Sequence, residues 1–326
     1  MRREFMNFTR LSSILPGAAF LVLLFTPLVL DLVGHRESSA AMENRATAGC
    51  PSPSLLWCSF PAYAARFERY YNDSFPLRRE LIRWNNLARL TLFGESPVKG
   101  VRTGREGWLF YATEWVLEDY ENVMPYKPEE LEAIGRILEE RRQWLARRGI
   151  RFLVVVPPNK HTIYPEYLPP ALHKLGKESR LDQVARYLQA YPEIQFIDLR
   201  PALFREKARQ RLYHRTDTHW NDYGAFVGYQ EIMERVSRAF LRVKRLSWED
   251  FRVEIEPEGK GGDLAGMLSL ADVMHEERIR LVPRFAPRAV DGARSYPEPV
   301  HHPGRERVIK ETGDSSLPKV LVFRDS

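Results

Sequence analysis

The sequence predicts an α/β fold, in which helices cover both faces of a mostly parallel central sheet in a three-layer sandwich. Three short runs of aliphatic and β-branched residues read as central strands, namely 152–156, 194–197 and 320–323. Amphipathic helical patterns fill the intervals over 181–190 and 226–240. Strands that alternate with helices along a chain give this architecture.

The first 36 residues are predicted to be a cytoplasmic tail and a transmembrane signal-anchor. Arg2, Arg3 and Arg10 precede an apolar run over 14–30, and this order of charge sends the rest of the chain out of the cytoplasm. As a helix the run reaches only about 25 Å, and its flanks extend it to the ~30 Å of a hydrocarbon core. A cleaved signal peptide, with small residues at 38–41, is the alternative. Both place the body in the periplasm, and the anchor holds it at the inner membrane.

Two regions follow the predicted anchor. Residues 37–100 are expected to form a periplasmic helical lead-in, interrupted at Phe75–Pro76 because proline lacks a backbone donor. Residues 101–326 are expected to form the main domain. Within it Pro128 begins a helix that Gly149 terminates, and 246–318 forms an insertion of short strands and loops. Cys50 and Cys58 could pair in an oxidising compartment or stay unpaired.

Composition narrows the classes of function. The chain of 326 residues is 44% hydrophobic, which argues against disorder. Its 49 Lys and Arg against 43 Asp and Glu leave a net charge of only +6. Basic runs with interleaved aromatics and zinc-finger spacings are both missing from the sequence, so we expect no nucleic-acid partner.

The candidate chemistry lies where the chain leaves the predicted strands, because ligands of open α/β sheets bind at the carboxyl ends of strands. Asp217 and His219 follow the second strand, and Ser326 follows the third. A serine hydroxyl becomes a nucleophile when a histidine takes its proton and a carboxylate holds the imidazole in the right tautomer. Three alternatives stay open: Asp217 as a helix cap, His219 as a surface histidine, and a metal site that would also use His214.

Several segments together resemble the AlgX/AlgJ family of SGNH-hydrolase-like polysaccharide O-acetyltransferases. They occur in the family's order: 43–45, 104–110, 156–160 with 164–169, the Thr-Asp-Thr-His-Trp segment 216–220, 261–265, and Asp325–Ser326. The resemblance implies an SGNH-hydrolase-like domain whose motif order is permuted. It also implies that Asp217 and His219 are the acid and base of a triad and that Ser326 is its nucleophile. Arg324 departs from the glycine usual at that position.

The resemblance implies a periplasmic enzyme that moves an acetyl group, through an acetyl-serine, to hydroxyls of an exopolysaccharide such as alginate. The acetyl donor would be a membrane-bound O-acyltransferase partner, and no cofactor or metal is called for. A carbohydrate acetyl esterase and a non-catalytic glycan-binding adaptor remain alternatives. Lys160, Tyr164, Trp220 and Trp108 are candidate substrate contacts, with core packing as the alternative for the aromatic ones. Because family members continue past the serine, we expect the chain as written to be C-terminally truncated and poorly active.

Overall fold

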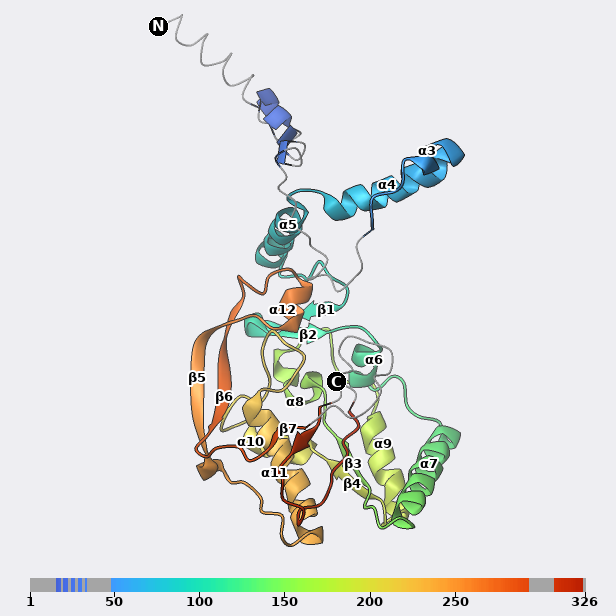
Figure 1. The fold of residues 1–326 in the computed structure, drawn as a ribbon, viewed down its shortest axis with the longest axis vertical. Coiled ribbons are helices and arrows are strands. Elements are labelled where there is room, and N and C mark those ends of the chain that lie inside the picture. The colour runs from blue at the N-terminus through green and yellow to red at the C-terminus, as the bar shows by residue number, and fades with distance from the viewer. Residues whose placement is uncertain are drawn as a thin grey trace, which may run out of the picture. The chain divides into compact units, whose positions relative to one another are not determined.

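The computed structural model describes residues 48–292 and 308–324, together with short helical pieces between residues 16 and 33 (Figure 1). The predicted membrane anchor therefore lies largely outside the described residues. Among those that are described, no helix is both long and apolar enough to cross a bilayer. The chain divides into two compact units, one formed by the part up to Thr103 with Gly261–Met274, and the other by Gly104–Lys260 with the part from His275 onward.

The first unit is mainly helical. It contains α3 (Ser54–Cys58), α4 (Phe60–Ser74), α5 (Arg78–Phe93), β1 (Val101–Thr103) and α12 (Asp263–Met267). The break predicted at Phe75–Pro76 is confirmed, since α4 ends just before it and α5 begins just after it. The buried Asn86 amide donates to the carbonyl of Leu268 at 2.8 Å, which ties α5 to the segment that returns from the far part of the chain. Cys50 and Cys58 carry free thiols.

The second unit holds the predicted α/β elements. Its strands are β2 (Leu109–Tyr111), β3 (Leu153–Val156), β4 (Gln195–Asp198), β5 (Phe251–Lys260), β6 (His275–Pro283), β7 (Val290–Asp291) and β8 (Lys310–Glu311). Its α-helices are α6 (Val116–Tyr120), α7 (Pro128–Ala146), α8 (Lys160–Ile163), α9 (Arg180–Tyr187), α10 (Arg200–Glu206) and α11 (Asp222–Ala239). The helix predicted to start at Pro128 is confirmed as α7.

The centre of this unit is a parallel pair of strands. β3 and β4 run side by side, with Leu153 opposite Gln195 and Val156 opposite Asp198. In Figure 1, α7 and α9 lie on one side of this pair, and α10 and α11 lie on the other. Capping residues fix where the helices start. At α9 the Ser179 hydroxyl oxygen accepts from the Asp182 amide, and the Asp182 carboxylate accepts from the Ser179 amide. The core packs around Phe110, Leu199 and Leu203, which are fully buried.

The wider parallel sheet that the sequence predicts is not borne out. Every sheet among the described residues has two strands, and β5–β6 and β7–β8 pair antiparallel. The run 320–323, predicted as a third parallel strand, has no assigned strand, and its side chains are 73–90% exposed. An apolar run becomes a central strand only where neighbouring strands satisfy its backbone and helices cover its faces. In this structure neither condition is met over 320–323.

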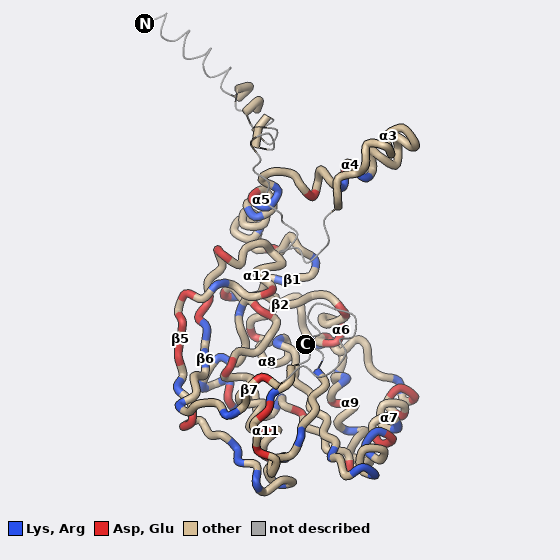
Figure 2. Tube along the Cα trace, viewed as in Figure 1, with Lys and Arg blue, Asp and Glu red and all other residues tan. Residues whose placement is uncertain are grey.

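A long antiparallel hairpin replaces the short strands expected in the insertion 246–318. β5 and β6 pair along almost their whole length, and the register places Glu254 opposite Arg280 and Glu256 opposite Arg278. Figure 2 shows the acidic positions that recur along β5. Opposite charges facing each other across an antiparallel pair stabilise it by about 0.2–1 kcal/mol each. The strict alternation of charged and apolar residues over 252–256 is the pattern from which this strand could have been predicted.

Candidate active site

Asp217 and His219 lie on a short closed loop between Leu212 and Asn221. Tyr213 and Trp220 form an isolated antiparallel bridge, the His214 amide donates to the His219 carbonyl at 3.2 Å, and the Asn221 amide donates to the Leu212 carbonyl at 2.9 Å. These bonds make the loop a small hairpin with Asp217 near its tip. The loop ends where α11 begins.

Asn221 fixes that end of the loop. It is 1% exposed, its Oδ1 caps α11 by accepting from the Gly224 amide at 3.0 Å, and its Nδ2 donates to the Arg211 carbonyl at 2.7 Å. A buried cap bonded on both sides leaves the loop little freedom at this end. The cap of α11 is therefore Asn221, and the alternative in which Asp217 caps this helix does not hold.

The predicted acid and base of the triad are in direct contact. His219 Nδ1 lies 2.7 Å from Asp217 Oδ1, and the His219 backbone amide donates to the same oxygen at 2.9 Å. The Asp217 side chain is 21% exposed and the His219 side chain is 56% exposed. With Nδ1 donating to the carboxylate, the imidazole is held in the tautomer whose Nε2 can accept a proton. A carboxylate that orients an accessible imidazole is the arrangement that activates an alcohol.

The segment after β3 packs beneath this loop. The Tyr213 hydroxyl donates to the Pro158 carbonyl. The Lys160 ammonium donates to the carbonyls of His214 and Arg215, each at 3.1 Å, and to that of Asp217 at 2.6 Å. Lys160 is 3% exposed, so the structure places this predicted substrate contact under the loop and not at its surface.

Sequence reasoning missed Glu276, which reaches the same loop from β6. Its carboxylate accepts from the Arg215 amide at 2.6 Å, from the Thr216 amide at 3.3 Å and from the Thr216 hydroxyl. Glu276 is 1% exposed although it belongs to a highly charged strand. No local pattern marks it out from its exposed acidic neighbours, because its burial depends on a loop 60 residues away.

The other predicted residues fall into three environments. Trp108 and Tyr164 are 3% and 4% exposed and belong to the core, as the packing alternative expected. Burial raises the pKa of Tyr164 to about 12, and its hydroxyl accepts from the Leu212 amide. Trp220 is half-buried and lies against Gly228 of α11, beside the loop. Ser326 lies outside the described residues.

Two further histidines near the loop are less accessible, since His161 is buried and His214 is half-buried. His161 packs against Phe110 and Tyr120, its Nε2 lies 2.9 Å from the Tyr111 carbonyl, and burial lowers its pKa to about 4. Burial also lowers the pKa of His214. His219 is therefore the accessible histidine of this loop region.

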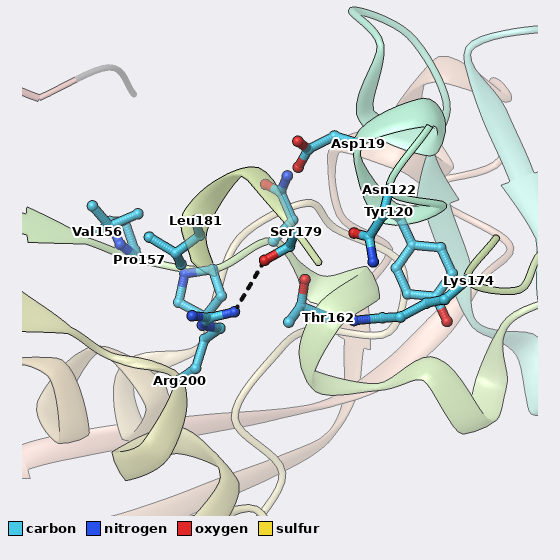
Figure 3. A pocket seen from close by; sticks show the side chains of 12 residues that line it. Asp119, Tyr120, Asn122, Val156, Pro157, Thr162, Lys174, Ser179, Leu181 and Arg200 are labelled. Carbon is cyan, nitrogen blue, oxygen red and sulfur yellow. Dashed lines mark hydrogen bonds between the residues drawn. The ribbon is translucent and has the colours of Figure 1, made fainter. Parts of the chain in front are cut away.

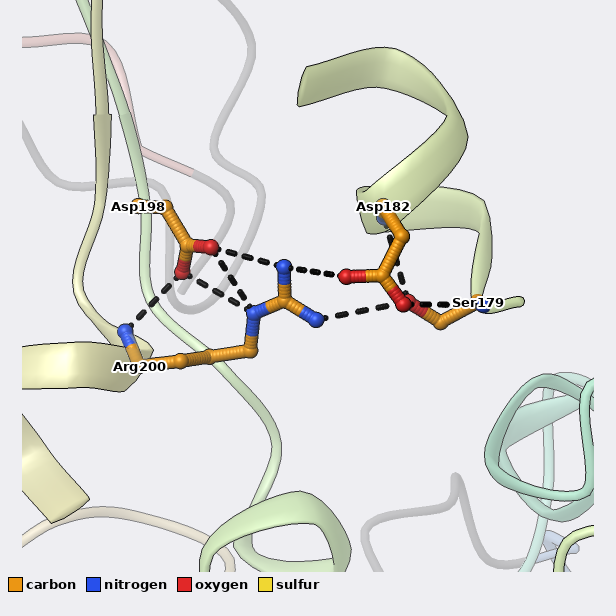
Figure 4. Close-up of polar contacts among 4 residues, drawn as sticks. All are labelled: Ser179, Asp182, Asp198 and Arg200. Carbon is orange, nitrogen blue, oxygen red and sulfur yellow. Dashed lines mark hydrogen bonds and ion pairs between the residues drawn. The ribbon is translucent and has the colours of Figure 1, made fainter. Parts of the chain in front are cut away.

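A separate small pocket opens at the carboxyl end of β3. Its volume is about 140 Å³, and Figure 3 shows Asn122, Thr162 and Lys174 on one part of its wall and Ser179 and Arg200 on another. Arg200 is held by two carboxylates, Asp198 and Asp182, each with an ion pair of 2.7 Å (Figure 4). Asp217 and His219 are not among the residues that line this pocket.

A family model described as "SGNH hydrolase-like domain, acetyltransferase AlgX" matches residues 101–296, which is more than half of the chain. The chain belongs to this family. The resemblance predicted from the ordered motifs is confirmed, and so is an SGNH-hydrolase-like fold class. The AlgX-type match takes in Asp217 and His219 and all of β2 to β6.

Curated relatives agree with the AlgX-type assignment. The probable alginate O-acetylase AlgJ of Azotobacter vinelandii is 30% identical over 228 residues, covering 66% of this chain and 53% of the relative. The probable alginate O-acetylase AlgJ of Pseudomonas aeruginosa is 29% identical over 274 residues, covering 81% and 64%. The chain thus spans about half to two thirds of the length of these relatives. Among solved structures, the O-acetyltransferase domain of Pseudomonas putida AlgJ aligns at 25% identity over 56% of this chain and 63% of that one, with a TM-score of 0.37.

Proposed function

We propose that the protein is an O-acetyltransferase that moves acetyl groups to hydroxyls of an exopolysaccharide of the alginate type. The observation that carries the proposal is the contact of 2.7 Å between Asp217 and His219 on a loop of an AlgX-type domain. The two relatives named as alginate O-acetylases support the reaction class and the polymer.

In the first step Ser326 is the nucleophile. His219 Nε2 takes the proton of the serine hydroxyl as the serine oxygen attacks the acetyl carbonyl of the donor. The bond between the acetyl carbon and the donor's leaving group then breaks, and the imidazolium returns its proton to that group. Asp217 stabilises the imidazolium while it exists. The product is an acetyl ester on Ser326.

In the second step a sugar hydroxyl replaces the serine. His219 takes the proton of that hydroxyl, the sugar oxygen attacks the acetyl-serine, and the serine oxygen leaves with the proton from His219. Because the His219 side chain is 56% exposed, water can reach the same position when no glycan is bound. Transfer in place of hydrolysis therefore requires that the bound polymer excludes water, and Trp220 beside the loop is a surface on which a sugar ring can stack.

The setting proposed for this reaction is the periplasmic face of the inner membrane. It is supported by the arginines that precede the apolar run 14–30 and by the resemblance to the AlgX/AlgJ family. A membrane-bound O-acyltransferase would supply the acetyl group. Ser326, the membrane anchor and this partner are all parts of the proposal.

The test is acetyl transfer by the protein from a chromogenic acetyl ester, with and without deacetylated alginate. If the protein is a transferase, the wild type produces acetylated polymer, and the His219→Ala and Ser326→Ala variants do not. Release of acetate at the same rate with and without polymer, and no acetylated product, would instead identify an esterase. Unchanged acetylation in both variants would leave the protein as a non-catalytic adaptor and refute the mechanism.

A further inference from the structure

Two buried charged side chains hold the loop that carries Asp217 and His219. Lys160 contacts the loop from the segment after β3, and Glu276 contacts it from β6. They are 3% and 1% exposed. Burying a charge costs several kcal/mol unless hydrogen bonds compensate it, so two buried charges on one short loop call for a role that apolar residues would not fill.

Their bonds to the loop are complementary. The Lys160 ammonium donates to three carbonyls, those of His214, Arg215 and Asp217. The Glu276 carboxylate accepts from the amides of Arg215 and Thr216 and from the Thr216 hydroxyl. Donors of the loop are thus satisfied by an anion and its acceptors by a cation, over four consecutive residues. Bonds to charged groups are roughly twice as strong as bonds between neutral groups.

The contact with Asp217 links this arrangement to the chemistry. Lys160 bonds to the Asp217 carbonyl at 2.6 Å, while the carboxylate of the same residue orients His219. A shift of the Asp217 backbone would therefore move the carboxylate relative to the imidazole. Misplacement of a catalytic group by about 1 Å can cost a hundredfold in rate.

We propose that Lys160 and Glu276 are positioning residues that clamp residues 214–217 and thereby fix the Asp217–His219 pair for acyl transfer. The proposal rests on the proposed function. It also reassigns Lys160, since the sequence suggested a substrate contact and the structure gives it a role through another residue. Both side chains bond to the loop, Lys160 to its carbonyls and Glu276 to its amides and the Thr216 hydroxyl, so we class them as positioning residues.

The test compares Lys160→Met and Glu276→Gln with matched control variants of the same protein. Lys207→Met removes a lysine that also donates to a backbone carbonyl, that of Ile163, and whose ion-pair partner is Glu166 at 2.8 Å. Glu231→Gln removes a half-buried carboxylate paired with Arg205 at 3.0 Å. An aryl sulfonyl fluoride labels the activated serine, and intact-mass measurement follows the labelling over time. The final labelled fraction gives the share of competent sites. The rate constant of labelling gives the reactivity of each competent site.

The clamp predicts a fall of tenfold or more in the rate constant per competent site for Lys160→Met and for Glu276→Gln, and no change beyond twofold in the controls. Because both act on one loop, the double variant should lose less than the product of the two single losses. A lower labelled fraction at an unchanged rate constant would mean that the two residues only stabilise the fold, and would overturn the proposal.

Amide hydrogen exchange of the segment 212–221 gives a readout that does not depend on activity. We expect faster exchange of the Arg215 and Thr216 amides in both variants. Glu276→Gln removes the anion that accepts from these amides, and Lys160→Met removes the ammonium that holds the carbonyls of the same loop. If the sulfonyl fluoride does not label the wild type but exchange is faster in both variants, then Lys160 and Glu276 do hold the loop, and the proposed acyl transfer is wrong. If exchange is unchanged in both variants, the clamp fails, whatever the activity.

Discussion

Replacing Asp217 by asparagine is the sharpest perturbation of the proposed site. Asparagine has the same shape, and its carbonyl oxygen can still accept from the His219 amide, which donates to Asp217 Oδ1 at 2.9 Å. The change therefore removes the negative charge and leaves the loop geometry in place. What is lost is the charge-assisted part of the 2.7 Å contact with His219 Nδ1.

The size of the effect follows from that contact. Hydrogen bonds to charged groups contribute about 1.5–3 kcal/mol, and neutral ones about 1. The Asp217 and His219 side chains are 21% and 56% exposed, so solvent screens the pair and the lower half of that range applies. Subtracting the neutral bond leaves a loss of about 0.5–1.2 kcal/mol, which corresponds to a decrease of about 2- to 8-fold in kcat, since about 1.4 kcal/mol is a factor of ten. If the amide instead turns its NH2 toward His219 and forces the wrong tautomer, the loss is larger.

The assay is acetyl transfer to polymer, measured as kcat and KM, with thermal unfolding as a check on the fold. The control is Asp222→Asn, which changes an exposed carboxylate at the start of α11 that accepts from the Leu281 amide at 3.1 Å. We expect kcat to fall only for Asp217→Asn, with KM and the unfolding temperature close to those of the wild type. Full activity of Asp217→Asn, or an equal loss in the control, would refute the role of Asp217.

Three further predictions concern stability. Burial lowers the pKa of His161 from 6.5 to about 4, so between these pH values the unfolded chain binds more protons than the folded one. The free energy of unfolding should therefore drop by about 3 kcal/mol as the pH falls through that window. His161→Phe should remove this contribution to the pH dependence in urea titrations. Gly224→Ala places a methyl group against the Leu212 carbonyl and should cost about 1–3 kcal/mol in the same assay, whereas Gly266→Ala, with nothing within 4 Å, should cost none. Arg200→Met leaves two carboxylates without their shared cation and should lower the unfolding free energy by about 2 kcal/mol at pH 7, and an unchanged denaturation midpoint would contradict that network.

Local signals in the sequence predicted the elements that depend on local physics. Pro128 marks the first turn of α7, and the break at Phe75–Pro76 separates α4 from α5. The apolar runs after 152 and 194 become the parallel pair β3 and β4. In each case the residue types determine the element through backbone chemistry or hydrophobic periodicity alone.

Elements that depend on distant partners could not be predicted in this way. The run 320–323 is as apolar as β3, yet its side chains are exposed, because composition does not state whether a neighbouring strand is present. Glu276 reads as one more charge in a charged strand, and only the loop that it contacts makes it distinctive. Lys160 misleads in the opposite direction. A lysine beside a predicted site suggests a substrate contact, whereas in the structure its ammonium bonds to backbone carbonyls of the loop.

The candidate site lies between these two cases. Asp217 and His219 are two residues apart, so their contact depends on one short loop, and the sequence was sufficient to suggest it. Ser326 is more than 100 residues from them along the sequence, so the contact with His219 that the proposal requires would depend on the tertiary fold. Its place after a predicted strand suggested this serine as the third member of the triad, and the resemblance to the AlgX/AlgJ family strengthened that prediction.

The central claim is that His219, oriented by Asp217, activates Ser326 to carry the acetyl group. The most direct measurement is peptide mass spectrometry of the protein after a brief reaction with an acetyl ester donor and rapid quenching. We predict a single acetylated peptide containing Ser326, which disappears in Ser326→Ala and in His219→Ala and is chased by added alginate. Acetylation of another residue, or an acetyl-Ser326 peptide that persists at the same level in His219→Ala, would contradict the claim.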